Sequence, residues 1–137
     1  MQTDNTLIVF IGAIGLLGAC AEIEMPTTTE GRVTYEQYCA ACHGETGVGD
    51  GPAAVGMHPA PANLTTIAAQ NGGSFPRAQT LSTIDGYQRD IPAGLEMPEF
   101  GNLLTGETVP MDVGDGVFTP TPRALAALLA YLESIQR

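Results

Sequence analysis

The sequence contains no lysine, and its five basic residues stand against fifteen acidic ones, for a formal net charge of −10. Proteins that bind nucleic acid neutralise its phosphates with clustered lysine and arginine, so we expect no nucleic-acid partner. A P-loop in the glycine-rich stretch 44–51 is excluded as well, because that loop requires a lysine. An acidic surface suits a protein partner with a basic docking patch, although it also serves solubility alone.

Histidine and cysteine are also scarce, with two histidines and three cysteines in 137 residues. We find no serine–histidine pair, no paired carboxylates and no metal-hydrolase pattern that would support acid–base or nucleophilic catalysis. The sequence therefore gives no reason to expect an enzyme.

A hydrophobic run long enough to cross a bilayer is missing too. The uncharged stretch 7–19 holds thirteen residues, whereas a spanning helix needs about 20. Its length fits the apolar core of a secretory signal. The letters "LGAC" at 17–20 resemble the bacterial lipobox, in which the signal is removed and the new N-terminal cysteine is lipidated. We therefore expect residues 1–20 to be a signal peptide and lipobox, with Cys20 as a lipid anchor on the periplasmic side of a bacterial membrane.

The residues before this run depart from the usual signal, because they include Asp4 and no lysine or arginine. An uncleaved N-terminal membrane anchor and plain secretion therefore remain alternatives. Each of the three versions places the rest of the chain outside the cytoplasm.

The remaining chain divides into a tether and one domain. Residues 21–30 have the acidic composition, rich in threonine and with one proline, of a linker. Fully extended, this stretch would reach about 30 Å at roughly 3.3 Å per residue. Residues 31–137 have the size of a single domain.

Two of the three cysteines, Cys39 and Cys42, lie close together, and His43 follows the second at once. A zinc site needs about four ligands; His58 could be a third, but a fourth is hard to find, because His43 would have to turn back onto the same ion. A redox-active CxxC would need a thioredoxin-like βαβ pattern, whereas the flanks are helical and glycine-rich. C-x-x-C-H is the attachment signature of c-type haem. On a helix-like turn the two thiols meet the vinyl groups at one porphyrin edge and the imidazole points toward iron, so we expect one covalently bound haem c.

From residue 31 to residue 137 the sequence resembles the monohaem class I c-type cytochromes. Gly31 and Tyr35 stand eight and four residues before Cys39, where that family has a glycine and an aromatic residue on its first helix. The resemblance implies an all-α class I cytochrome c fold, with short helices wrapped around one covalent haem.

Three further elements are expected along the chain. Apolar residues over 125–137 recur with the spacing of one helix face, which predicts an amphipathic C-terminal helix. The resemblance implies that Leu128 and Tyr131 of this helix face the first helix. A short helix is expected over residues 80–87. Residues 107–120 alternate around a "GDG" turn and predict a small β-hairpin inserted before the C-terminal helix.

The second axial ligand of the iron distinguishes electron transfer from oxygen chemistry. The stretch "LEMPEFGNLL" resembles the family's Met-Pro-x-Phe-Gly loop, which implies Met97 as this ligand and Phe100 packed nearby. Ligation by His58, ligation by Met111 and an open position remain alternatives.

The same resemblance implies a proline carbonyl that accepts a hydrogen bond from the imidazole of His43 and orients it. Pro61 or Pro59 would supply this carbonyl. Arg77 and Arg89 could neutralise a haem propionate, although a plain exposed arginine is the default interpretation of each.

Ligation by His43 and Met97 would leave no iron position for a substrate. We therefore expect one-electron transfer by a membrane-tethered periplasmic cytochrome that exchanges electrons with redox protein partners. One alternative is a fixed haem subunit of a larger oxidoreductase complex. Another is a haem-based gas sensor, which would need an open or easily displaced sixth position.

Overall fold

The computed structural model describes residues 23–87, 97–114 and 116–137. The predicted signal peptide and lipobox, with Cys20, lie outside these residues. The elements follow one another as α1 (Thr28–Tyr38), α2 (Ala40–His43), η1 (Pro52–Ala54), η2 (Leu64–Thr66), α3 (Ile67–Gln70), α4 (Arg77–Asp85), β1 (Thr108–Asp112), β2 (Phe118–Pro122) and α5 (Arg123–Ser134). In its described residues the protein is thus mostly helical with one two-stranded antiparallel sheet, which is compatible with a cytochrome c fold. No helix in the described part of the chain is both long and apolar enough to cross a membrane.

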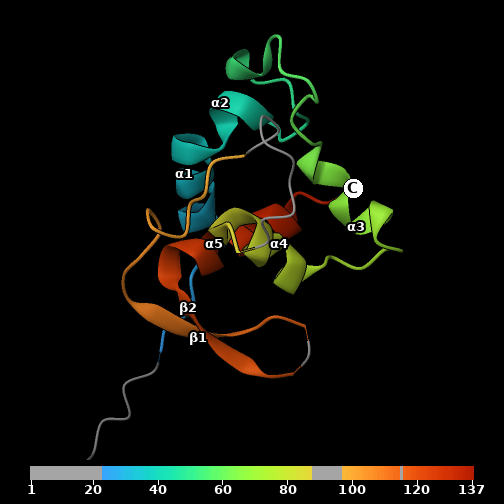
Figure 1. The fold of residues 1–137 in the computed structure, drawn as a ribbon. Helices are drawn as coiled ribbons and strands as arrows, with labels where there is room; N and C mark the ends of the chain where they lie inside the picture. Colours follow the sequence, from blue (N-terminus) through green and yellow to red (C-terminus); the bar gives the residue numbers. More distant parts are fainter. Residues whose placement is uncertain (1–22, 88–96, 115) are drawn as a thin grey trace, which may run out of the picture.

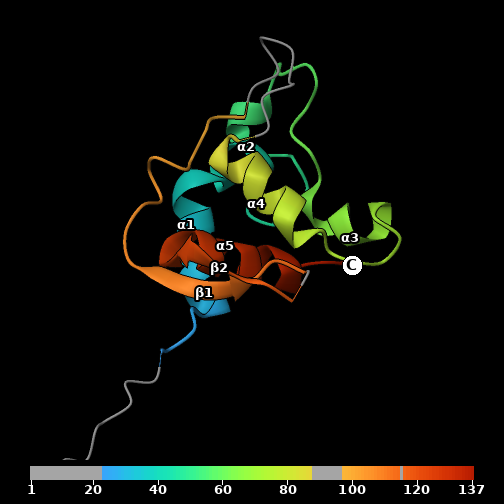
Figure 2. The same ribbon diagram turned by 60° about the horizontal axis from the view of Figure 1, so that its bottom comes forward.

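The two views of the ribbon agree on the arrangement of these elements (Figures 1 and 2). The α2 helix and the loop after it lie at one end of the molecule. The hairpin of β1 and β2 lies at the other end, beside the point where the described chain begins. The helices α1, α4 and α5 lie between the two ends.

Helix α1 begins with a capping box. The Thr27 hydroxyl accepts a hydrogen bond from the Glu30 backbone N–H at 3.2 Å, and the Glu30 carboxylate accepts one from the Thr27 N–H at 2.6 Å. These bonds satisfy two of the donors that a helix N-terminus leaves without a partner. The bond from the Thr27 N–H, with further hydrogen bonds from the Thr27 hydroxyl and from Arg123, holds the pKa of the Glu30 carboxyl below its usual range. The helix therefore starts at Thr28, within the stretch 21–30 that its composition predicts to be a tether.

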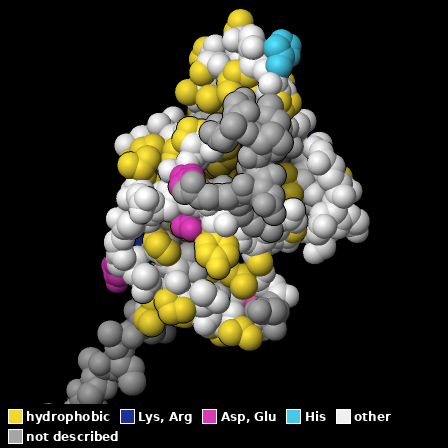
Figure 3. Space-filling model, in the orientation of Figure 1, with side chains coloured by type: hydrophobic (Ala, Val, Ile, Leu, Met, Phe, Trp, Pro, Cys, Tyr) yellow, Lys and Arg dark blue, Asp and Glu magenta, His cyan; other side chains and the backbone are white. Residues whose placement is uncertain are grey.

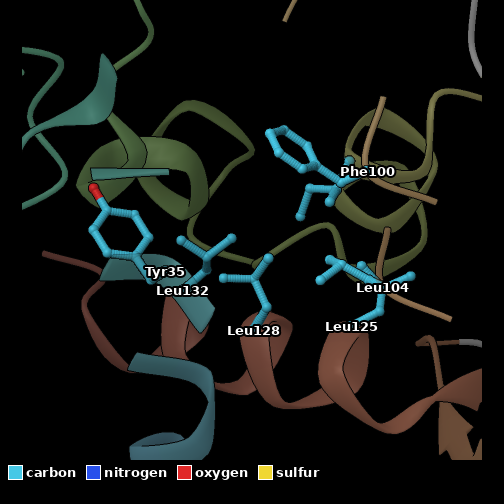
Figure 4. Packing of buried hydrophobic residues seen from close by; sticks show 7 residues of the cluster. Tyr35, Phe100, Leu104, Leu125, Leu128 and Leu132 are labelled. Carbon is cyan, nitrogen blue, oxygen red and sulfur yellow. The ribbon is translucent and has the colours of Figure 1, made fainter. Parts of the chain in front are cut away.

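Helices α1 and α5 pack across each other, as the resemblance implies. Gly31 is buried against Ala127 and Tyr131 of α5. The Tyr35 ring lies 5.2 Å from the Tyr131 ring, measured between centroids, and Tyr35 belongs to the same buried cluster as Leu128. Figure 4 shows the leucines of α5 pointing toward one side, with Tyr35 near one end of their row, Leu104 near the other, and Phe100 above it. This row of leucines forms one side of the hydrophobic core, and Tyr35, Phe100 and Leu104 pack in the same cluster.

Gly31→Ala should destabilise the protein, although alanine is normally better than glycine in a helix by about 1 kcal/mol. A Cβ atom at Gly31 would overlap the Ala127 carbonyl oxygen and lie 2.7 Å from Tyr131 Cβ. Because the overlap is with backbone, we expect α1 and α5 to be pushed apart, at a cost of ~1–3 kcal/mol. Denaturant titration of the haem-loaded protein measures this change. Thr29→Ala, at an exposed position of the same helix, is the matched control and should change stability little. A Gly31→Ala protein as stable as the wild type would contradict the close crossing.

The predicted hairpin is present. Strands β1 and β2 pair with Val109 opposite Thr121, and both residues are buried. The Asp112 carboxylate accepts hydrogen bonds from the N–H groups of Gly114 and Gly116, at 2.8 and 3.0 Å, and so closes the turn. The hairpin packs on α5 by its buried residues, while its turn projects from the molecule.

Helix α4 matches the short helix predicted near residues 80–87, but it starts earlier, at Arg77. It ends at Asp85 and is capped by Gly86, whose φ of 92° is left-handed and suits glycine. After the undescribed residues 88–96, the chain returns to this helix end, where the Phe100 N–H donates to the Ile84 carbonyl at 2.9 Å. The segment that begins at Met97 is thereby anchored to α4.

Candidate functional site

The two cysteines and the histidine of the CxxCH motif lie on one tight turn. Helix α1 ends at Tyr38, Cys39 caps it, and the short helix α2 runs directly on to His43. The backbone N–H groups of Cys42 and His43 both donate to the Cys39 carbonyl, at 3.1 and 2.9 Å. Because residues three apart share one side of a helix, this turn directs both thiols the same way.

The two thiols are free, which argues against a disulfide. Burial, with a smaller contribution from neighbouring Cys42, raises the pKa of the Cys39 thiol to about 11. Cysteines of redox-active CxxC motifs have the opposite character, with lowered pKa values. Among the described residues no group of three or more histidine, cysteine or acidic side chains could hold a metal ion, so a zinc site has no support.

His43 is buried, and its orientation is fixed by a hydrogen bond. Its Nδ1 lies 3.0 Å from the Ala62 carbonyl oxygen. A carbonyl oxygen can only accept, so Nδ1 carries the proton and Nε2 is left as the nitrogen that can bind a metal. The prediction that the carbonyl of Pro61 or Pro59 accepts this bond is wrong. The turn before η2 brings the carbonyl of Ala62, the residue after Pro61, to His43 instead. Pro61 instead lines the cavity described next.

Tyr35 fixes the same turn from the side of α1. Its hydroxyl donates to the Gly44 carbonyl oxygen at 2.5 Å. Burial raises the pKa of Tyr35 well above its ordinary value, so the hydroxyl stays protonated and remains a donor. The CxxCH turn is thus held at its end by a side chain that also packs on α5.

A hollow lies beside this turn and consists of two adjoining cavities of ≈400 and ≈320 Å³. Both are bordered by Cys39, His43 and Met97. The larger cavity is walled by the α5 leucines Leu128 and Leu132. The predicted pair of axial ligands, 54 residues apart in the sequence, therefore borders one and the same hollow.

The residues after Met97 are held by aromatic packing. Phe100 is buried, and its ring lies 6.2 Å from the Tyr38 ring in an edge-on contact. Figure 4 shows Phe100 and Leu104 above the leucines of α5. Met97 packs against the buried cluster to which Phe100 belongs, so the two residues lie in the same part of the core.

The rival ligands lie elsewhere. His58 is exposed, and Met111 lies on β1. Neither residue is among those that border the two described cavities. Met57 does border the smaller cavity, but it lies at its outer side, with 41% of its surface exposed.

Arg77 does not face the hollow. Its guanidinium forms a two-pronged ion pair with Glu133 of α5, with a shortest distance of 2.8 Å, and also donates to the Asp112 carbonyl at 3.4 Å. It therefore joins α4 to α5 and to the hairpin, a role that the sequence did not indicate. Arg89, the other candidate, lies outside the described residues.

The polar groups that do border the larger cavity are neutral ones from α3 and α4 and their ends. These residues are Gln70, Asn71, Gln79, Thr80 and Thr83. They were not predicted from the sequence. Amide and hydroxyl groups can hydrogen-bond the carboxylates of a haem. No spacing or motif marks such residues, because glutamine, asparagine and threonine are common on any exposed helix.

The residues fit a covalent haem by several independent features. The hollow with leucine walls is bordered by two thiols, by an imidazole whose Nε2 is free to bind a metal, and by a thioether. These are the groups that attach and ligate haem in c-type cytochromes.

Comparisons with known proteins agree with this interpretation. The family model described as cytochrome c oxidase, cbb3-type, subunit III matches residues 26–110. A solved structure, the Kuenenia stuttgartiensis reducing HAO-like protein complex Kustc0457/Kustc0458, is 28% identical with a TM-score of 0.53. The similarity covers 83% of this chain but only 46% of that one, so this chain spans less than half the length of its structural neighbour. No curated protein matches.

The family match takes in α1, the CxxCH turn, α4 and the Met97 segment, and it covers more than half of the chain. Family membership implies covalently bound haem c and a role in electron transfer. The chain belongs to the c-type cytochrome family that this subunit III model describes.

Proposed function

We propose that this protein carries single electrons through one haem that Cys39 and Cys42 attach and that His43 and Met97 ligate. The observation that supports the proposal most is the common border of the two cavities, to which the CxxCH turn and Met97 both contribute. The bound haem supplies a one-electron ferric–ferrous couple.

The chain's own residues would hold the iron ligands in place and set which oxidation state is favoured. The Ala62 carbonyl holds His43 in one tautomer and one orientation. Met97, which Phe100 helps to anchor, would supply the second ligand, and a thioether would favour reduced iron relative to a second imidazole. Leu128 and Leu132, which border the larger cavity, would keep water from the bound haem and would further disfavour the extra charge of the oxidised state.

Electrons would enter and leave by the smaller cavity. Its outer border is made of exposed residues of the loop after η1, namely Met57, Pro59 and Ala60. These short or apolar side chains let a partner approach the ring edge closely.

The test is the electronic spectrum of the purified protein. Oxidised iron with histidine and methionine ligands gives a weak charge-transfer band in the far red, which bis-histidine or open sites lack. We expect this band, a low-spin reduced spectrum and no rapid carbon monoxide binding at neutral pH. Rapid carbon monoxide binding would instead favour the gas sensor.

The domain would act outside the cytoplasm, on the periplasmic side of a bacterial membrane, held there by a lipid on Cys20. The apolar stretch 7–19 and the letters "LGAC" support this proposal. Mass spectrometry of the N-terminus from membrane-purified protein tests it. An intact Met1 would rule out lipidation and favour the uncleaved anchor.

The acidic surface predicts that docking of a basic redox partner weakens with salt. The Debye length falls from about 30 Å at 0.01 M to about 8 Å at 0.15 M salt. Between these concentrations, electron exchange with a purified basic redox protein should slow by on the order of tenfold, because steering is lost. Stopped-flow mixing measures the rate, and exchange with a small neutral reductant is the control. A rate that does not change with salt would contradict electrostatic docking.

A fixed haem subunit is the second candidate. The matched family is described as a subunit of cytochrome c oxidase, and the structural neighbour is named as part of a complex. A subunit should co-purify with a catalytic partner after mild solubilisation of native membranes. A mobile carrier should be recovered alone.

A further inference from the structure

The start of the domain is held to the hairpin end of the molecule by Arg123, the first residue of α5. Its guanidinium pairs with the Glu30 carboxylate at 3.0 Å and donates to the Glu24 carbonyl oxygen at 2.6 Å. Arg123 directly follows β2, and its own N–H donates to the Glu107 carbonyl just before β1, at 2.8 Å. The chain therefore enters the domain at the base of the hairpin.

The contacts of Arg123 with Glu24 and Glu30 are called the clamp below. The clamp shortens the predicted tether. A free linker over residues 21–30 would let the domain move about 30 Å from its anchor, at ~3.3 Å per residue. With Glu24 held by Arg123, only three residues lie between Cys20 and Glu24, and the four steps along the chain allow only ~13 Å by the same rule. The hairpin end must then stay near any membrane that holds Cys20.

This end carries exposed apolar side chains. Val117, just before β2, and Phe118, the first residue of β2, are 60% and 67% exposed, and Ile23, where the described chain begins, is 63% exposed. Figure 3 shows hydrophobic side chains over the hairpin, at the end opposite the loop after α2. The charged groups near this end are the acidic Glu24, Glu30, Glu107 and Asp112 and the one basic residue Arg123, which is paired with Glu30. Their net charge is negative, so attraction to anionic lipid is not the driving force.

We infer that the hairpin rests on the lipid bilayer, with Val117 and Phe118 at the acyl boundary and the smaller cavity facing away from the membrane. This orientation rests on the anchored form of the proposed function. The anchor supplies attachment, and a short link makes even a weak apolar contact effective, because the contact becomes intramolecular. The outer residues of the smaller cavity lie in the loop at the far end of the molecule, so they stay open to a soluble partner (Figures 1 and 2).

The test uses the full-length, haem-loaded protein in phosphatidylcholine vesicles. Phe118 is replaced by the photoreactive benzoylphenylalanine in one sample, and Val55, which is 86% exposed in the far loop, is replaced in another. After illumination, mass spectrometry identifies what each position has joined. We expect lipid adducts at position 118 and none at position 55, whether or not the vesicles also contain anionic lipid.

A second variant tests the clamp. Arg123→Gln removes the ion pair with Glu30 and should lower the yield of lipid adducts at position 118 several-fold, because the domain then moves on a longer link. The visible spectrum should stay unchanged, since Arg123 does not border the two cavities around His43 and Met97.

Several results would overturn the inference. Lipid adducts at position 55 rather than 118 would mean the opposite orientation. No lipid adduct at either position would mean that the domain stands off the membrane. Adducts to a protein at position 118, in native membranes, would identify a partner subunit as the true occupant. Failure of the protein to sediment with vesicles would remove the anchor and this orientation together, while the haem spectrum would still report on electron transfer separately.

Discussion

Met97→Ala should abolish the far-red charge-transfer band of the oxidised protein and lower its reduction potential. The thioether stabilises reduced iron, and axial ligands move haem potentials over a range of about 0.8 V, so we expect a fall on the order of 0.1 V. Loss of the sixth ligand should also open the iron to carbon monoxide. Spectra and a redox titration of the variant measure all three changes.

The rival ligands provide matched controls for this variant. Met111→Ala and His58→Ala should both keep the band and the potential, because neither residue borders the described cavities. Persistence of the band in Met97→Ala, or its loss in either control, would contradict the ligand assignment.

The double variant with Cys39→Ser and Cys42→Ser should lack covalent haem and should not hold the native fold. Without the ring, the leucines Leu128 and Leu132 that border the larger cavity would face water. Exposing such apolar side chains costs about 1.5–3 kcal/mol each, which is a large share of the stability of a small domain, roughly 5–15 kcal/mol. We therefore expect the ring to complete the core between α4 and α5.

Haem staining of a denaturing gel, together with circular dichroism, measures both losses. Cys20→Ser is the control and should keep its covalent haem, because the CxxCH turn is intact. A double variant that stays fully folded without haem would contradict the view that the ring completes the core.

The parts of the site that depend on neighbouring residues were predictable from the sequence. The CxxCH spacing works within a single helical turn, so the motif alone indicates where the two thiols and the imidazole lie. The leucine periodicity of α5 and the alternation around the hairpin turn are likewise local patterns. The capping box of Thr27 and Glu30 also has a local sequence signal, a threonine followed three residues later by a glutamate. The composition of the stretch nevertheless led to the prediction of a tether.

The parts that depend on the folded chain were not predictable. Any backbone carbonyl near Pro61 could have accepted from His43, and only the turn itself selects Ala62. The ion pair of Arg77 with Glu133 joins residues 56 apart, and the bond from Arg123 to Glu24 joins residues 99 apart. Such pairings depend on how α5 crosses the other helices, and no pattern along the sequence records this crossing.

The most direct test of the account is the NMR spectrum of the reduced protein with ¹³C-labelled methionine methyl groups. A methyl group whose sulfur binds iron lies over the porphyrin face, where the ring current shifts its resonance far upfield. Of the five methionines, one methyl resonance should be shifted in this way, and Met97→Ala should remove it while Met111→Ala leaves it in place. A spectrum without an upfield methionine methyl, or one whose shifted signal survives in Met97→Ala, would contradict electron transfer through a haem ligated by His43 and Met97.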